Sequence, residues 1–274
     1  MIVKKIINKF ISLINKISLF IRTPRLTILI FQIRFIERYL KIDLFFLFPR
    51  RLIIYMIEFF LLKNSNSNKF QHYGNCQLKK NMIPKNPIVY SGGVGTNISF
   101  DLEILKKHKG IVRLFDPTKS SINYINSLKK IKNFNFYPYA LYYKNKKVKL
   151  YTDPSNRIKS TSINNFLEFD SKSFYYAQAH NLPFLMKKFK DKKIDILKLD
   201  IEGVAEDLIL NLFNNGKYPS QIVSAFEIPL NYIKFFKFLC IFFKLIKVIN
   251  KKYDLYNLRY RSRGVEMEIL AIKK

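Results

Sequence analysis

Short apolar runs alternate with helix-like patterns from residue 86 to the C-terminus. Brief apolar runs are typical of buried strands, whereas apolar residues spaced by three and four are typical of helices. The pattern predicts strands at 87–90, 111–115, 140–143 and 148–151, one that starts at 194, and one at 221–226. It predicts helices from residue 100 and over 120–131, 182–189, 204–213 and 232–249. This alternation favours an α/β fold with a mostly parallel sheet.

Two strand pairs are expected to be antiparallel. Residues 148–151 should pair back on 140–143 as a hairpin through a turn at Asn145. Residues 253–260 and 265–272 should form a second pair at the C-terminus. The stretch 152–180 is expected to be an insertion between the predicted strands.

The first 62 residues follow a different pattern. Apolar residues recur at helical spacing through 2–21 with Lys and Asn largely between them, which predicts a basic amphipathic helix. The same polar residues interrupt any apolar core of a signal peptide. Charged residues also break the apolar stretch 26–62, so one or two further helices are expected but a membrane-spanning helix is disfavoured. This helical extension either lies on a membrane or packs on its own domain.

A polar boundary separates the extension from the α/β pattern. Residues 63–69 are polar and of low complexity, with little to bury. An irregular approach is expected over 71–85, bringing Tyr73 and Cys76 toward the segment that follows. The chain is therefore divided into a helical extension (1–62), a linker and approach (63–85), and an α/β domain (86–274).

Three glycines within four residues follow the first predicted strand of the α/β domain. Glycine permits a sharp turn from Ser91 to Gly95, because it adopts φ > 0 and lets a ligand approach the backbone. A strand, a glycine turn and a helix form the nucleotide-binding opening of many α/β sheets. The turn is therefore a candidate cofactor site, although a turn without a ligand explains this pattern equally well.

An acidic residue ends the next predicted strand. Asp116 follows Gly93 at about the 20-residue spacing at which a carboxylate receives ribose hydroxyls. Its two oxygens are acceptors suited to a vicinal diol. Pro117 ends the strand, because it lacks the N–H group that a ladder hydrogen bond needs. The spacing supports a nucleotide-like cofactor at the glycine turn.

A charged cluster follows the apolar strand that starts at residue 194. Lys198, Asp200 and Glu202 share one side if the chain stays extended, since side chains alternate along a strand. Unpaired charge beside a buried strand is costly, so either a functional site or a Lys–Asp ion pair that closes the sheet edge is expected. Glu227, after strand 221–226, should reach the same edge. These residues are the clustered candidates for acid–base or orienting groups.

Five segments, in order, resemble the FkbM-type methyltransferase family. They are VYSGGVG at 89–95, FDPT at 115–118, YALYYKN at 139–145, IDILKLDIEG at 194–203 and AFEI at 225–228. The resemblance runs from residue 86 to the C-terminus. It implies the class I methyltransferase fold, which is Rossmann-like and ends in an antiparallel hairpin, and S-adenosylmethionine as the cofactor.

The resemblance also implies roles for individual residues. Cofactor contacts are implied for Ser91, Gly92, Gly93, Gly95, Thr96, Asp116, Pro117 and Ala140, the last near the adenine. On the acceptor side, the clustered residues Lys198, Asp200, Glu202 and Glu227 are the candidates for catalysis. The implied reaction is O-methylation of a sugar hydroxyl on a glycan or glycolipid.

This chain departs from the family pattern in two places. Many relatives carry an acidic residue just before the glycine turn, where Tyr90 and Ser91 stand here. The acid that follows Glu202 comes one position later than usual, at Glu206, with Ala205 in its place. An alternative function is therefore a membrane- or anion-binding protein with a degenerate, catalytically inactive methyltransferase fold. A dinucleotide-dependent dehydrogenase fits less well, because the charged run and terminal hairpin are not expected of one.

The chain is strongly basic, with 49 Lys and Arg against 19 Asp and Glu and a formal net charge of +30. This excess favours an anionic partner such as a membrane surface or an acidic glycan, and A/T-rich coding explains it equally well. Nucleic acid is the less favoured partner. We expect a cytoplasmic protein, with peripheral attachment to the inner membrane face as an open option.

The metal-binding and redox residue types form no pattern. Cys76 and Cys240 are far apart, so neither a disulfide framework nor a zinc site is predicted. The carboxylates of the charged cluster could bind a divalent ion in principle. They define no ligand set, so no metal is predicted. His72, His108 and His180 share no motif and are expected on the surface.

Overall fold

The computed structural model describes residues 53–54, 56–64, 69–152, 161–163, 172–229, 231–259 and 266–274. The chain divides into two compact units, Met1–Leu62 and Lys63–Lys274. In the first unit, the described residues between 53 and 61 are helical. The amphipathic helix expected at 2–21, and any helix before residue 53, lie outside the described residues. No helix in the described part of the chain has the length and apolar character needed to cross a membrane.

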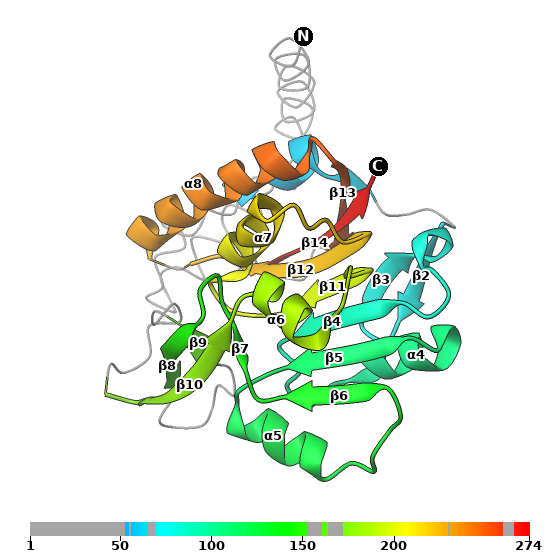
Figure 1. The fold of residues 1–274 in the computed structure, drawn as a ribbon. Helices are drawn as coiled ribbons and strands as arrows, with labels where there is room; N and C mark the ends of the chain where they lie inside the picture. The colour runs from blue at the N-terminus through cyan, green and yellow to red at the C-terminus, as the bar shows by residue number, and fades with distance from the viewer. Residues whose placement is uncertain are drawn as a thin grey trace, which may run out of the picture. The chain divides into compact units, whose positions relative to one another are not determined.

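Within the described residues, eight strands form the main sheet of the second unit (Figure 1). Their order is β1 (Lys63–Asn64), β13 (Tyr253–Arg259), β14 (Glu266–Lys273), β12 (Gln221–Glu227), β11 (Ile196–Leu199), β4 (Ile88–Gly92), β5 (Ile111–Phe115) and β6 (Phe134–Tyr137). Strand β14 runs antiparallel to both its neighbours, whereas all other neighbouring pairs are parallel. The predicted mostly parallel sheet with a C-terminal antiparallel pair is confirmed.

Helices cover both faces of this sheet. Their bounds are α4 (Ser99–His108), α5 (Lys119–Asn126), α6 (Leu182–Phe189), α7 (Ala205–Asn214) and α8 (Tyr232–Ile249). Residues of α4 and α5 pack into the core on one face, with Val89, Val112 and Ile196 of the sheet. On the other face, Phe189 of α6 contacts Tyr90, and Phe242 of α8 contacts Phe226. The helices predicted at 182–189 and 232–249 match α6 and α8.

A hairpin precedes the glycine turn, where the sequence suggests an irregular approach. Strands β2 (Phe70–Tyr73) and β3 (Cys76–Lys79) pair antiparallel, and the short 3₁₀ helix η1 (Lys80–Met82) follows. Tyr73, Cys76 and Leu78 are buried in the core beside α4, which stabilises the hairpin against the domain. The Gln221 side chain also accepts a hydrogen bond from the Lys79 N–H at 2.8 Å. These tertiary contacts supply the order that the local pattern lacks.

A second sheet lies beyond the main one, in the order β7 (Ala140–Leu141), β10 (Phe174–His180), β8 (Lys146–Thr152) and β9 (Thr161–Ile163). The predicted hairpin between 140–143 and 148–151 is wrong, because β10 lies between them and pairs with both. Strand β10 falls in the stretch expected to be an insertion. Small Ala177 and Ala179 on its inner face let it pack closely on the core of this sheet. Strand β10 is distant from β7 and β8 in the sequence, so the local hydrophobic pattern does not indicate this pairing.

The surface location expected for the histidines is wrong for one of them. His72 is exposed, and His108 is half-buried against the Tyr73 hydroxyl at 3.0 Å. His180 is buried, with its ring stacked on Phe184 and edge-on to Tyr139. Aromatic neighbours from other elements thus bury a residue whose own sequence surroundings suggest exposure.

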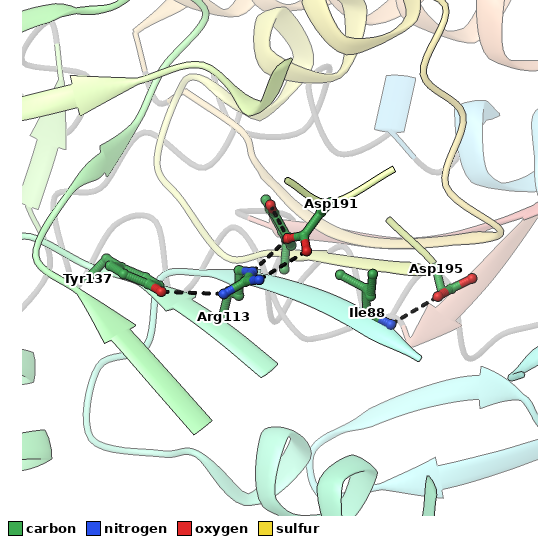
Figure 2. A network of polar contacts seen from close by, with 6 residues as sticks. Ile88, Arg113, Tyr137, Asp191 and Asp195 are labelled. Atoms are coloured by element: carbon green, nitrogen blue, oxygen red, sulfur yellow. Dashed lines mark hydrogen bonds and ion pairs between the residues drawn. The ribbon is translucent and has the colours of Figure 1, made fainter. Parts of the chain in front are cut away.

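A buried ion pair ties α6 to the centre of the sheet (Figure 2). The Arg113 guanidinium donates to both oxygens of Asp191, at 2.6 and 3.0 Å. The Tyr90 hydroxyl donates to the same carboxylate at 2.7 Å. Arg113 also lies over the Phe189 ring, 4.5 Å from its centroid. Tyr90 is therefore engaged in holding α6 on β4 and β5.

Candidate active site

The strand order places a crevice between β4 and β11. From β4 the chain continues outward to β5 and β6, whereas from β11 it continues in the opposite direction to β12. Connections on either side of such a reversal leave a crevice at the carboxyl ends of the strands, where α/β proteins bind ligands. A cavity of about 390 Å³ lies there, lined by the glycine turn, the residues after β5 and β11, and the inner face of the second sheet.

The glycine turn is held against both neighbouring strands. The Gly93 N–H donates to the Phe115 carbonyl at 3.1 Å, and the Asp200 N–H donates to the Gly92 carbonyl at 2.9 Å. Gly93 has φ +77°, and a Cβ there would collide with the carbonyl of Asp200. Gly95 also has positive φ, but its missing side chain faces open space. Close packing therefore requires glycine at 93, and the free space at 95 belongs to the cavity.

Asp116 connects the glycine turn to the end of β5. Its buried carboxylate accepts hydrogen bonds from the backbone N–H groups of Val94 (2.8 Å), Gly95 (3.1 Å) and Thr118 (2.8 Å), and from the Ser121 hydroxyl (2.8 Å). Three of these donors share Oδ2, and only the Thr118 N–H uses Oδ1. A carboxylate oxygen has about two acceptor positions, so Oδ1 is the atom left for a ligand hydroxyl.

Lys198 lies beneath the glycine turn in a buried charged cluster. Its Nζ is 3.4 Å from the Gly93 carbonyl oxygen. Burial lowers its pKa, but the combined charges of Asp101, Asp200, Cys76 and Glu268 outweigh that effect and raise it. Burial raises the pKa of Asp101, which lies in the first turn of α4, and the positive charge of Lys198 counteracts the rise. The two buried groups thus stabilise each other's charged form.

Carboxylates gather at the same edge of the sheet. Asp200 is exposed at the end of β11, and Glu202 and Glu227 lie next to each other. Burial and the neighbouring charge of Glu202 raise the pKa of Glu227 to about 9, with smaller contributions from Glu266 and Asp200. At neutral pH, Glu227 therefore keeps its proton and can donate a hydrogen bond to Glu202.

This protonated pair should make the stability of the fold depend on pH. The folded-state pKa of Glu227 lies above its ordinary value of 4.5, so its stabilising contribution is full below pH 4.5 and is lost as the pH rises toward 9. We expect Glu227→Gln to flatten the decline in melting temperature between pH 5 and pH 9. Thermal unfolding of both proteins across this range measures the difference.

Glu103→Gln is the matched control for that measurement. Glu103 is an exposed acid whose pKa is lowered by Lys107 and by the N–H of Gly74. Its removal should leave the slope above pH 5 as it is in the unmodified protein. Equal slopes for the unmodified protein and Glu227→Gln would show that the Glu202–Glu227 pair does not hold a proton.

The structure brings most of the predicted site residues to the cavity. Of those assigned to the cofactor, Gly93, Gly95, Thr96, Asp116, Pro117 and Ala140 line it. Of those assigned to catalysis, Lys198, Asp200 and Glu202 line it. Ser91 and Gly92 lie behind the turn as buried residues of β4, and Glu227 reaches the site through Glu202.

Other residues that line the cavity are not predicted by the sequence patterns. Asn75 comes from the β2–β3 turn, and Thr118 and Ser120 come from the start of α5. Leu150 and Thr161 come from the second sheet. Of these residues, Thr118 and Ser120 could have been predicted, because they closely follow Asp116 in the sequence. The described residues include no cluster of His, Cys, Asp and Glu suited to a metal ion.

The fold and the position of this cavity define the class I methyltransferase fold. Its hallmarks here are the parallel strands with a reversal at β4 and β11, and antiparallel β14 between β12 and β13. The assignment rests on this strand order. No protein-family model and no curated protein matches the chain.

Several solved structures resemble the chain at low sequence identity. The crystal structure of methyltransferase FkbM from Methylobacillus flagellatus matches 81% of this chain with 9% identity and a TM-score of 0.46. The chain spans 52% of that protein, about half its length. Fibrillarin, a pre-rRNA processing protein of Methanococcus jannaschii, matches with 12% identity, a TM-score of 0.39, and 70% and 68% of the two chains covered. M. jannaschii TYW2 in complex with AdoMet matches with 10% identity, a TM-score of 0.35, and 76% and 87% covered.

Proposed function

We propose that the protein is an S-adenosylmethionine-dependent O-methyltransferase that acts on a sugar hydroxyl of a glycan or glycolipid. The observation that carries this proposal is that the glycine turn and the carboxylates at the end of β11 line the same cavity. A cofactor held by the turn and an acceptor held by the carboxylates would meet there. Catalysis by alignment requires little more than such proximity.

The cavity fits S-adenosylmethionine in size and chemistry. Its volume of about 390 Å³ falls within the range of small-molecule sites. Ala140, Leu141 and Ile201 give an apolar wall suited to an adenine ring, and Asp116 Oδ1 lies at the polar end for a ribose hydroxyl. When bound, the cofactor supplies an electrophilic methyl group on a sulfonium centre. We assign its binding to the glycine turn, Asp116 and the segment around Ala140.

The acceptor side favours a hydroxyl-rich substrate. Asp200 and Glu202 line the cavity, and Glu227 lies behind them. Carboxylates accept hydrogen bonds from sugar hydroxyls, whereas clustered carboxylates repel the phosphates of a nucleic acid. Asp200 is placed to orient the hydroxyl and to take its proton as it reacts. Lys198 is buried under the turn, where its Nζ lies 3.4 Å from the Gly93 carbonyl oxygen and helps to hold the turn in position.

Cofactor binding tests the proposal and the assignment of Asp116 together. We expect calorimetry on the full chain to detect S-adenosylmethionine binding, and Asp116→Asn to weaken it about 10- to 100-fold, or 1–3 kcal/mol. The amide can keep one acceptor on the glycine turn but replaces the second with a donor. Incubation with labelled cofactor and glycan or glycolipid extracts of the source cells then tests methyl transfer.

Ser121→Ala is the matched control, because it removes a donor to Oδ2 and leaves Oδ1 untouched. Its affinity should stay close to that of the unmodified protein. Unchanged affinity in a folded Asp116→Asn variant would restrict Asp116 to holding the turn. No cofactor binding by the unmodified protein would favour the alternative, an inactive fold that binds membranes or anions, for which the four internal hydrogen bonds of Asp116 already suffice.

A further inference from the structure

One face of α8 exposes large apolar side chains to solvent. Ile233 is 69% exposed, Phe236 is 59% exposed and Phe243 is 46% exposed. The opposite face of α8 is buried, with Phe235, Phe238 and Phe242 among its core residues, so the helix does not need the outward residues for packing. Exposed apolar residues on one stripe are a mark of an interaction surface, whereas scattered ones are ordinary.

Lysines share this outward face. Lys237, Lys244 and Lys247 are exposed and alternate along the helix with the apolar residues. At 3.6 residues per turn, these six side chains fall within an arc of roughly 120°. The sequence of α8 contains no Asp or Glu. On the neighbouring α7, burial raises the pKa of Asp207, and the charge of Lys244 partly offsets that rise. The surface is therefore both apolar and cationic.

We propose that this outward face of α8 docks on an anionic lipid bilayer. An interfacial helix places its large apolar side chains among the acyl chains while lysines contact anionic headgroups, and this face presents both sets together. Two copies of the chain that met through this face would bring their lysines together, and α8 supplies no carboxylate to pair with them. The combination of bulky apolar groups and excess positive charge fits a lipid surface better than a second copy.

The docking face begins at the edge of the sheet that also holds the cavity. Helix α8 starts five residues after Glu227, which ends β12, and the side chain of the preceding Asn231 accepts hydrogen bonds from the N–H groups of Ile233 and Lys234. Figure 1 shows α8 starting on the side where the arrows of β4 and β5 end. A bilayer against this face would thus lie near the acceptor side of the site. This last step rests on the proposed function and identifies a lipid-linked glycan as the substrate class.

The chain carries a natural reporter for this contact. It has two cysteines, of which Cys240 is exposed on the outward arc of α8 and Cys76 is buried. Burial raises the pKa of the Cys76 thiol to about 12, so a thiol reagent should label Cys240 selectively. We expect an environment-sensitive fluorophore on Cys240 of the full chain to shift to shorter wavelength with phosphatidylcholine–phosphatidylserine vesicles. Spin-labelled lipids in the bilayer should quench it.

Matched variants separate α8 from other basic or aromatic surfaces. Phe236→Ser should weaken vesicle binding about tenfold or more, whereas Tyr176→Ser, at a residue that is 53% exposed on β10, should not. Lys237→Glu with Lys247→Glu should weaken binding to anionic vesicles in the same way. Lys106→Glu with Lys192→Glu, two exposed lysines elsewhere, should have little effect.

Three outcomes would overturn the proposal. The chain could fail to bind anionic vesicles, or it could bind them while the label on Cys240 stays in water, which would assign binding to another segment. A label that responds to protein concentration without vesicles would assign the face to a second copy. These readouts involve no methyl transfer, so failure of the proposed enzymatic function would leave them unaffected.

Discussion

Asp200→Asn is expected to lower methyl transfer to a sugar acceptor about 10²- to 10⁴-fold, the usual cost of losing a positioned acid–base group. Asp200 lines the cavity at the end of β11, and its backbone is fixed to the glycine turn through the Gly92 carbonyl. The side chain is exposed, so the amide should change charge at the site without disturbing the fold. Turnover with labelled cofactor and the acceptor found in the extracts measures the loss.

Two further measurements make this result specific to the reaction. The affinity of Asp200→Asn for S-adenosylmethionine and its melting temperature should match those of the unmodified protein. Asp254→Asn, a surface acid of β13 paired with Lys63 at 2.8 Å, should retain full turnover. If Asp200→Asn kept full turnover, the proton of the acceptor would have to be taken elsewhere, with Glu202 as the next candidate.

Lys198→Met is expected to destabilise the fold by about 1–3 kcal/mol, because the buried Asp101 loses the charge that most favours its ionised form. Asp101 is buried, and Lys198 is the largest influence that favours its charged form. Removal of the cation also removes the contact with the Gly93 carbonyl, so the glycine turn should loosen. Urea unfolding measures the stability change, and calorimetry measures the loss of cofactor affinity.

A double-mutant cycle tests whether the two buried groups act as a pair. Lys198→Met combined with Asp101→Asn should be more stable than the sum of the single changes allows, because no unpaired charge stays buried. Lys106→Met, an exposed lysine on α4, should cost little. Additive effects in the cycle would mean that Lys198 and Asp101 contribute to stability independently. That result would also contradict the proposed role of Lys198 in positioning the glycine turn.

The hydrophobic pattern of the sequence correctly predicts those helices and strands that depend on the spacing of apolar residues within a short stretch of chain. Strand 111–115 and helices 182–189 and 232–249 coincide with β5, α6 and α8, since each has a clear apolar period. Helix 120–131 ends early, at Asn126, where the Ser127 N–H turns back to the Asn123 carbonyl. The hairpin expected at 148–151 fails because β10, from a distant stretch of chain, provides better partners on both sides.

The residues of the candidate site also divide into those that the sequence predicts and those that it does not. Gly93, Asp116 and Asp200 are predictable because a turn, a strand end and an alternating charged run each require particular residue types at short spacing. Asp101 and Asn75 are not predictable from the sequence. Nothing near them in the chain indicates that Asp101 will feel the charge of Lys198 or that Asn75 will line the cavity. The proton on Glu227 likewise depends on Glu202, which belongs to another strand connection.

The sequence by itself therefore determined the helices and strands that have a clear apolar period, the glycine turn, and which charged residues end which strands. These follow from side-chain period, backbone freedom and spacing, which act over a few residues. Only the tertiary structure decided that Asp116 holds the turn through the N–H groups of Val94 and Gly95, that the buried Lys198 feels the charge of Asp101, and that lysines and phenylalanines share the outward face of α8. Burial and long-range pairing set those properties, because they depend on which distant segments displace water from each side chain.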